Sequence, residues 1–381
     1  MLAELKVMRR SEQTIQWNRQ KMDWYLDHGG GTETVGKRAS PLCYEPGQFA
    51  LRRYRVLGFG DVDRTHGGWT MARRFRFGIC TDQNMTWEKN VERWQLFERL
   101  GFESAWLCDH LVQPSRPQGP YFEAWSLLGG LAARTEKIRI GVLVTSNTFR
   151  HPSVLAKMAL TVDHISNGRL EVGLGAGWYE SEHKMFGIPF PETRELVARF
   201  REAVQVVDLL MREDTSSFAG SYYQLMNAQS RPPSIQKPRP PLVLGAFGPR
   251  MLKIVATYAD TWNAFGTPKE MRERNQMLDD YCREIGRQPD TLDRSLYYWV
   301  PTTDADPWAS KQAFYEVIDP YIEAGVNQFI LDQPRDDQLD MLEWVAAEVL
   351  PRFARETPHT VETAAAGQID TSAWKRPQDH L

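Results

Sequence analysis

Short apolar runs alternate with segments of helical spacing from Phe75 to about Phe353. The run at 75–80 has the β-rich composition of a strand. Apolar residues then recur at helical spacing over 87–100, between Thr86, a candidate N-cap, and Gly101, a candidate C-cap. This first unit therefore predicts a strand followed by an amphipathic helix.

The same unit recurs along the chain. Further strands are expected at 104–108, 138–145, 170–174, 242–244, 261–264, 295–300 and 328–331. Helices are expected at about 122–134, 152–165, 196–211, 307–324 and 336–350, and from Pro249 and Pro268. Eight strands in strict alternation with eight helices fit a closed parallel barrel better than an open doubly wound sheet. The predicted fold is α/β, a single (β/α)8 TIM barrel.

The two ends of the chain differ from this pattern. Residues 1–70 contain Gly29-Gly30-Gly31 and scattered arginines and tryptophans, with no sustained apolar period. We interpret them as a poorly ordered N-terminal extension before a natural start at Met71, the alternative being a loosely folded regulatory arm. The barrel domain then spans 71–354, and 355–381 form a flexible, polar C-terminal tail.

Composition narrows the possible functions. A net charge of −3 is unlike the basic excess of a nucleic-acid binder. The chain has neither the roughly 20 apolar residues of a membrane helix nor a secretory signal, so a cytoplasmic location is expected. The four cysteines form no CxxC pair, which indicates neither a zinc site nor a disulfide framework. Cys80 and Cys108 lie in apolar runs and are interpreted as small buried side chains.

Candidate chemistry lies where strands end, because barrel enzymes place their active sites in the loops after the strands. The loop from Gly245 to Arg250 has glycines for close approach to a ligand, a helix start at Pro249 and a cation. This predicts a phosphate site, the alternative being a tight turn. Gly173-Leu174-Gly175-Ala176-Gly177 fails the GxGxxG fingerprint at Trp178 and is either a flat ligand surface or a structural turn.

Asp109-His110 follows the second strand, where a histidine can exchange protons near neutral pH. The alternative is a structural histidine held by hydrogen bonds. His151 and His183 are weaker candidates in loops at the same end. A metal-dependent hydrolase would carry HxH on the first strand or an HExxH helix, and neither occurs in the sequence, so no metal site is expected.

Several segments together resemble the luciferase-like monooxygenase family. They are Arg76 to Ile79, Ser104 to His110, Asn147 to Pro152, Asp163 to Leu170, Gly173 to Glu180, Gly245 to Leu252 and Asp260 to Asn263. The resemblance covers roughly Phe75 to Phe353. Within the family, the chain is most similar to the branch that uses the deazaflavin coenzyme F420, and less so to the branch that uses reduced FMN and oxygen.

The resemblance implies a bent isoalloxazine-type ring at the barrel mouth, backed by a non-proline cis peptide at Leu143-Val144. It implies His110 and Asp109 as catalytic residues. The cofactor-binding residues would be Leu143, Val144, Asn147, Ala176, Gly177, Gly245, Gly248 and Arg250. Phe149 and Trp178 would line the substrate pocket. The family's sugar-phosphate dehydrogenases carry a catalytic glutamate where this chain has Trp178, which implies a more apolar substrate.

The expected function is F420-dependent hydride transfer to or from a small organic substrate, with His110 assisting proton movement. The first alternative is an FMN-dependent monooxygenase. The second is a non-catalytic protein that binds flavin or deazaflavin. No nucleic-acid or membrane partner is expected, and a homodimer is possible because dimers are common among relatives.

Overall fold

The computed structural model describes residues 74–300, 303 and 305–354. The predicted extension at 1–70, the start at Met71 and the tail at 355–381 lie outside these residues. Within the described part, no helix is long and apolar enough to cross a bilayer.

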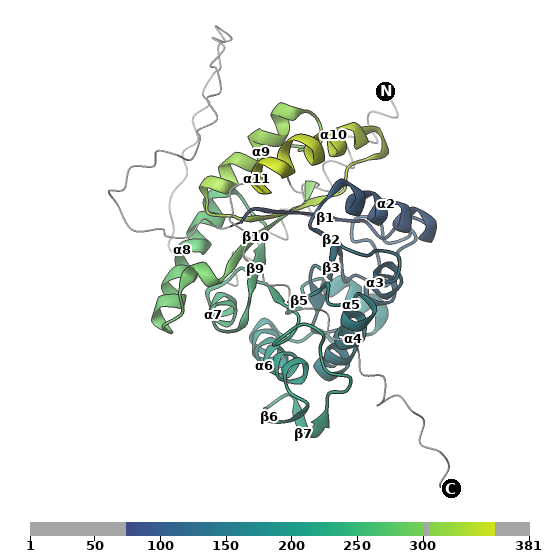
Figure 1. The fold of residues 1–381 in the computed structure, drawn as a ribbon. Helices are drawn as coiled ribbons and strands as arrows, with labels where there is room; N and C mark the ends of the chain where they lie inside the picture. The colour runs from purple at the N-terminus through teal and green to yellow at the C-terminus, as the bar shows by residue number, and fades with distance from the viewer. Residues whose placement is uncertain (1–73, 301–302, 304, 355–381) are drawn as a thin grey trace.

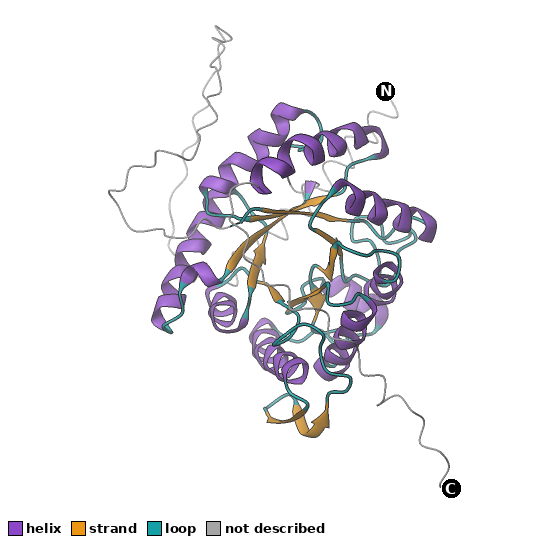
Figure 2. Ribbon diagram, viewed as in Figure 1, coloured by secondary structure: helices purple, strands orange, loops and turns teal. Residues whose placement is uncertain are grey.

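The described chain forms a closed barrel of eight parallel strands, as predicted. In barrel order the strands are β1 (Arg76–Cys80), β2 (Ser104–Leu107), β3 (Arg139–Val142), β5 (Leu170–Gly175), β8 (Leu242–Gly245), β9 (Thr261–Ala264), β10 (Asp293–Tyr298) and β11 (Gln328–Asp332). Pairing of β11 with β1 and of β3 with β5 completes the ring seen in Figure 2. A two-residue strand, β4 (Thr145–Ser146), continues β3 and also pairs with β5.

Helices surround the ring (Figure 1). They are α2 (Trp87–Leu100), α3 (Ala124–Ala132), α4 (Pro152–Ile165), α6 (Thr193–Arg212), α7 (Pro249–Tyr258), α8 (Pro268–Glu284), α9 (Lys311–Glu323), α10 (Leu339–Trp344) and α11 (Leu350–Ala354). A π-helical segment, Val345–Val349, joins the last two. The predicted caps of α2 are confirmed: Thr86 accepts a hydrogen bond from the Lys89 amide, and Gly101 adopts a left-handed φ of 84°.

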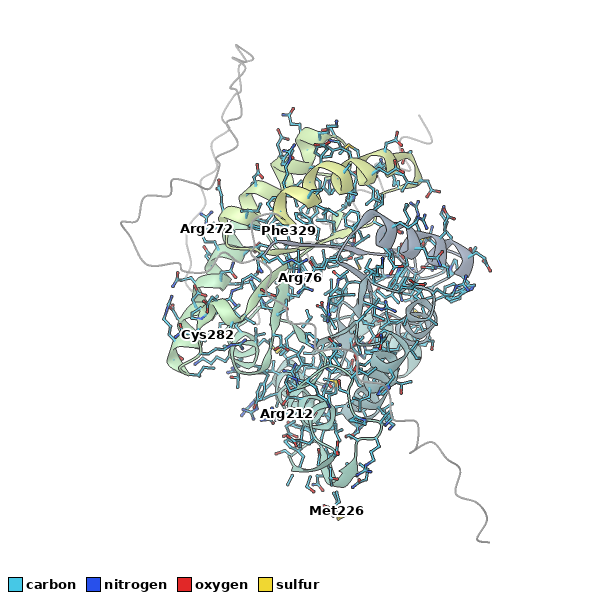
Figure 3. All side chains as sticks on the ribbon, viewed as in Figure 1. Arg76, Arg212, Met226, Arg272, Cys282 and Phe329 are labelled. Atoms are coloured by element: carbon cyan, nitrogen blue, oxygen red, sulfur yellow. The ribbon has the colours of Figure 1, made fainter. Side chains whose placement is uncertain are left out.

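A helix and two strands outside the predicted pattern were not expected. The long loop after β5 contains a short helix, α5 (Glu180–Phe186). Beyond α6, the strands β6 (Thr215–Ala219) and β7 (Gln224–Gln229) form an antiparallel hairpin outside the barrel. Figure 3 shows Met226 at the outer end of this hairpin, and its side chain is 86% exposed.

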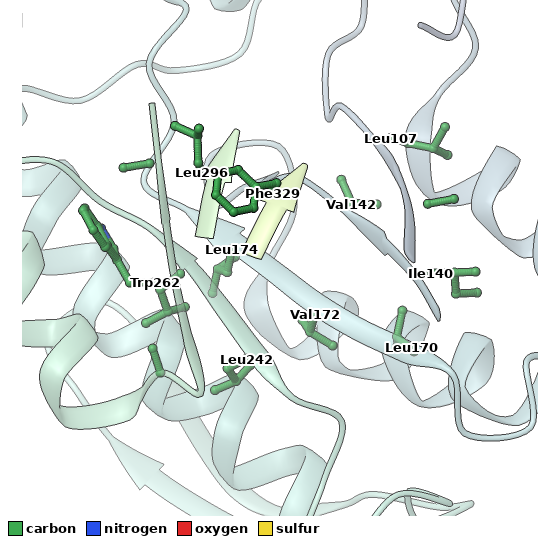
Figure 4. Packing of buried hydrophobic residues seen from close by; sticks show 14 of the residues in the cluster. Leu107, Ile140, Val142, Leu170, Val172, Leu174, Leu242, Trp262, Leu296 and Phe329 are labelled. Carbon is green, nitrogen blue, oxygen red and sulfur yellow. The ribbon is translucent and has the colours of Figure 1, made fainter. Parts of the chain in front are cut away.

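Side chains alternate between the two faces of the barrel wall. Those facing the helices form the main hydrophobic core, part of which is drawn in Figure 4. A second, smaller cluster contains the alternate residues Cys80, Trp106, Leu143, Val243 and Ile330. Since strand side chains alternate with a period of two, this second cluster fills the barrel interior.

Trp106 is the largest side chain of the interior cluster and is fully buried. Its indole Nε1 donates to Ser104 Oγ at 2.8 Å. A Cβ added at Gly141 would lie 2.4 Å from Trp106 Cζ3, and one added at Gly78 would lie 3.2 Å from its Nε1. Glycines on the two neighbouring strands therefore make room for the indole, which closes the barrel below the C-terminal ends of the strands.

Candidate active site

A cavity of about 850 Å³ lies where the barrel strands end, which is the location expected from the fold. It is lined by eleven of the twelve residues predicted for the site: Asp109, His110, Leu143, Val144, Phe149, Ala176, Gly177, Trp178, Gly245, Gly248 and Arg250. The twelfth, Asn147, does not line the cavity. Its side chain is buried behind the wall, where Nδ2 donates to the Tyr223 hydroxyl at 3.3 Å, so direct contact with a cofactor in the cavity is not expected of Asn147.

Bare backbone forms one wall of the cavity around Val144. The peptide Leu143-Val144 is cis, at the position that the family resemblance implies. A Cβ added at Gly175 or Gly245 would lie 2.7 or 2.8 Å from Val144 Cγ2. Only glycine fits at these two positions, because real Cβ atoms do not approach other atoms so closely. The backbone of Gly175 and Gly245 and the Val144 side chain therefore form this side of the cavity.

His110 is paired with a buried carboxylate that the sequence analysis did not assign. Its ring Nδ1 lies 3.0 Å from Glu182 Oε2, and Glu182 is fully buried at the start of α5. The other oxygen, Oε1, accepts the backbone amides of Leu111 at 2.5 Å and Val112 at 3.0 Å. An ionised carboxylate can only accept, so Nδ1 carries a proton and Nε2 is the nitrogen left for a ligand.

Asp109 has a different environment from its neighbour. Its two carboxylate oxygens accept from the Arg150 guanidinium at 2.6 and 2.9 Å, and Oδ2 also accepts the Ser146 amide at 2.7 Å. These bonds tie the end of β2 to β4 and the loop after it. Both oxygens are therefore engaged in holding the chain after β2 against β4, and the predicted catalytic role of Asp109 stays a prediction.

Aromatic residues cover the other side of His110. Trp178 and Tyr179 contact the imidazole edge-on, with ring centroids 5.5 and 6.0 Å away. Phe149 packs on His183 at 4.9 Å. Both ring nitrogens of His183 are occupied, by Thr148 Oγ1 at 2.6 Å and the Tyr179 carbonyl at 2.8 Å, so His183 is a structural member of the wall.

His151 is an exposed N-cap of α4, where its Nδ1 accepts the Ser153 amide. It is not among the residues that line the cavity.

The N-terminus of α7 forms the polar end of the cavity. Gly248 is its N-cap and makes no side-chain capping bond, so the first amides of the helix are available to an anion. Arg250 is exposed in the first turn and forms no ion pair with a carboxylate of the described residues. This arrangement has the donors and the positive charge that an anion needs, and the phosphate site at this position stays a prediction.

Asp332, at the end of β11, is a second ionisable group that the sequence analysis did not identify. It accepts the Tyr297 hydroxyl at 2.8 Å and the Val300 amide at 3.0 Å, and both it and Tyr297 line the cavity. Burial raises the pKa of Asp332 to about 7, although these two hydrogen bonds act in the opposite direction. The signal in the sequence is its position directly after the strand predicted at 328–331.

No group of three or more potential metal ligands occurs in the described part of the chain. The polar groups of the cavity include a histidine–glutamate pair, a helix N-terminus with a nearby arginine, and an aspartate–tyrosine pair. Such a set can bind an anionic group at one end and exchange protons with a ligand at the other.

Comparison with known proteins agrees with this geometry. The family model for luciferase-like monooxygenases matches residues 65–369. An F420-dependent glucose-6-phosphate dehydrogenase from Kineococcus radiotolerans is 34% identical over 307 residues, covering 67% of this chain and 89% of the relative. A 5,10-methylenetetrahydromethanopterin reductase from Methanopyrus kandleri is 32% identical over 216 residues, covering 52% of this chain and 58% of the relative.

A solved structure of an F420-dependent secondary alcohol dehydrogenase with an F420–acetone adduct superimposes with a TM-score of 0.65 at 20% identity. The match covers 74% of this chain and 99% of that chain, and at this identity it supports the fold alone. The match of the family model extends over most of the sequence and includes the whole barrel. The chain therefore belongs to the luciferase-like monooxygenase family.

Proposed function

We propose that the protein is an F420-dependent oxidoreductase that transfers a hydride between the deazaflavin and a small, largely apolar organic substrate. The observation that carries this proposal is the His110–Glu182 pair, which faces a cavity with a glycine-lined wall and an anion-binding helix end. The relative from Kineococcus radiotolerans named above is an F420-dependent dehydrogenase, which supports the same cofactor here.

The residues of the cavity fit such a cofactor. A planar ring needs a flat, apolar surface, which the Leu143-Val144 segment and the glycines beside it would provide. A phosphate needs donors and positive charge, which the first amides of α7 and Arg250 would provide. When bound, the deazaflavin supplies a ring carbon that accepts or donates a hydride.

In this mechanism, His110 moves a proton at its Nε2 atom. Glu182 holds the proton on Nδ1, so Nε2 of the neutral ring can accept a proton from a substrate hydroxyl in the oxidative direction. The imidazolium that forms is stabilised by the buried carboxylate at 3.0 Å. Trp178 and Tyr179 pack against the ring, which keeps its orientation and excludes water from that side.

The aromatic residues of the cavity wall limit which class of substrate the cavity favours. Trp178 stands where the sugar-phosphate dehydrogenases of the family are expected to carry a catalytic glutamate. The cavity also contains Phe149, Leu143 and Val144. These residues favour an alcohol or carbonyl compound with an apolar body over a sugar phosphate.

The test is a parallel titration with coenzyme F420 and with FMN, followed by fluorescence. Preferential binding of F420, with its reduction by a secondary alcohol and not by glucose 6-phosphate, is the expected result. The H110A variant should keep F420 affinity and lose turnover. Preferential binding of FMN with consumption of oxygen would move the assignment to a monooxygenase. Binding of neither cofactor would contradict the proposal.

A further inference from the structure

Two cysteines meet in the wall of the cavity. Cys80 is the last residue of β1, and Cys108 directly follows β2, the neighbouring strand in the barrel. Both side chains line the cavity, and their sulfur atoms lie 3.6 Å apart. Neither forms a disulfide in this structure. The mechanism proposed above uses neither thiol.

Their surroundings distinguish the two thiols. Cys80 is buried, with 3% of its surface exposed, whereas Cys108 is only partly buried. The Cys108 sulfur lies 4.0 Å from the Tyr297 hydroxyl, which donates to Asp332. Within the described residues, the pair belongs to no cluster that could hold a metal ion. The pair is thus a dithiol with one accessible and one buried member.

We propose that Cys80 and Cys108 form an oxidisable dithiol that closes to a disulfide inside the cavity and weakens ligand binding there. The oxidant would be a peroxide. The thiolate of Cys108, the more accessible member, attacks one peroxide oxygen, which gives a sulfenic acid and, after protonation, one water. The Cys80 sulfur then attacks the sulfenic sulfur, the S–O bond breaks, and a second water leaves. Two thiols and one hydrogen peroxide thereby give one disulfide and two waters.

The geometry supports closure within the folded barrel. A disulfide has a sulfur–sulfur length of about 2.05 Å, so the two sulfur atoms must approach by roughly 1.6 Å from their present separation. Cys80 pairs in register with Trp106, two residues before Cys108, so the two side chains are diagonal neighbours, and closure combines rotation about χ1 with a small shift of the chain after β2. The strands that carry the cysteines are hydrogen-bonded neighbours, so closure does not require two distant loops to meet.

The order of the two steps follows from the same environment. Cys80 is buried and Cys108 is only partly buried, so free oxidant reaches Cys108 first. The hydrogen bond with the Cys108 thiol and burial also raise the pKa of Cys80. Cys108 therefore reacts first, and Cys80 acts as the resolving thiol. Closure would replace two thiols by a bridge beside Tyr297, which alters the shape of the cavity at that wall.

The experiment uses the full chain with C43A and C282A, which leaves only the two cavity cysteines. A few equivalents of hydrogen peroxide are added to the folded protein, and peptides are mapped by mass spectrometry without reduction. We expect a Cys80–Cys108 disulfide, loss of both free thiols, and severalfold weaker binding of coenzyme F420 that dithiothreitol restores. The same mapping on the unsubstituted protein covers the case in which the double variant fails to fold.

Two further variants, C80S and C108S, serve as matched controls. With C80S, Cys108 should oxidise beyond the sulfenic acid, whereas with C108S the buried Cys80 should stay reduced. Sulfinic acid on Cys108 beside a free Cys80, or no reaction until the protein is unfolded, would overturn the proposal. A Cys80–Cys108 disulfide that leaves the affinity for F420 unchanged would overturn the proposed effect of the disulfide on ligand binding. The measurement of F420 affinity rests on the proposed function. A protein that forms the disulfide but binds no F420 in either redox state would refute that function and leave the dithiol established.

Discussion

Replacing Glu182 with glutamine tests the central element of the proposed mechanism. The amide keeps one oxygen, which can still accept the backbone amides of Leu111 and Val112. Its NH2 group, however, would donate to Nδ1 of His110, so the ring proton would move to Nε2. The nitrogen available to a substrate hydroxyl would then no longer accept a proton.

The size of the effect follows from the bond that is lost. A hydrogen bond to a charged group contributes about 1.5–3 kcal/mol. The Glu182 carboxylate stabilises the imidazolium only when His110 has taken up a proton, so this energy appears in the reaction step. At about 1.4 kcal/mol for each factor of ten, E182Q should lower kcat by roughly 10- to 150-fold.

The assay is steady-state reduction of coenzyme F420 by the alcohol identified in the substrate test, with kcat and KM measured across pH. F420 affinity and thermal stability are measured alongside. E180Q is the matched control, because Glu180 is exposed on the same helix and forms a surface ion pair with Lys184. A kcat for E182Q within twofold of that of the unsubstituted protein would refute the role of the pair. So would an equal loss in E180Q.

Three further predictions concern the barrel and its cavity. G141A should lower the free energy of unfolding in urea by about 1–3 kcal/mol, because its Cβ would lie 2.4 Å from Trp106 Cζ3 and 2.7 Å from the Glu171 carbonyl. G129A adds a Cβ in α3 that meets no atom within 4 Å, so it should not lower the free energy of unfolding. Equal stability of the two variants would contradict this packing. Asp332 keeps its proton to about pH 7 when folded and loses it near pH 4 when unfolded, so it contributes stability below pH 4 that is lost as the pH rises to 7. The free energy of unfolding of D332N should therefore not show this decline with pH. Parallel pH profiles for D332N and the unsubstituted protein would exclude the assignment of the decline to Asp332. R250A should weaken F420 binding about tenfold, most at low salt. K253A, which changes an exposed lysine on the same helix, should bind normally, and an unaffected R250A would remove Arg250 from the phosphate site.

The barrel could be predicted because its strands and helices bury opposite faces in a regular order. The helix at 152–165 and the strand at 261–264 were predicted with the observed bounds. The hairpin β6–β7 was missed because its residues are largely exposed and carry no apolar alternation. The strand expected at 295–300 lies at 293–298, since backbone pairing with β9 and β11 sets its bounds.

The site was predictable where strand ends alone decide which residues face the cavity. Glu182 was not assigned, because it belongs to a short helix in a long loop, and only the fold of that loop brings it to His110. The contact of Cys80 with Cys108 joins residues 28 apart, and that of Tyr297 with Asp332 joins residues 35 apart. The predicted barrel makes these strands neighbours, but which of their side chains meet depends on the register and the exact strand ends, which the spacing of apolar residues does not fix.

The tryptophan inside the barrel has a consequence for protein design. Trp106 and its two glycine neighbours are complementary in volume, so changes at these positions must be made together. The strands around the indole are held by backbone hydrogen bonds on both sides, so a smaller residue at 106 would leave a hollow that the wall cannot collapse to fill. Such a variant would deepen the chamber toward the middle of the barrel. A designer who wishes to admit longer substrates would therefore begin at Trp106 and offset the lost packing elsewhere.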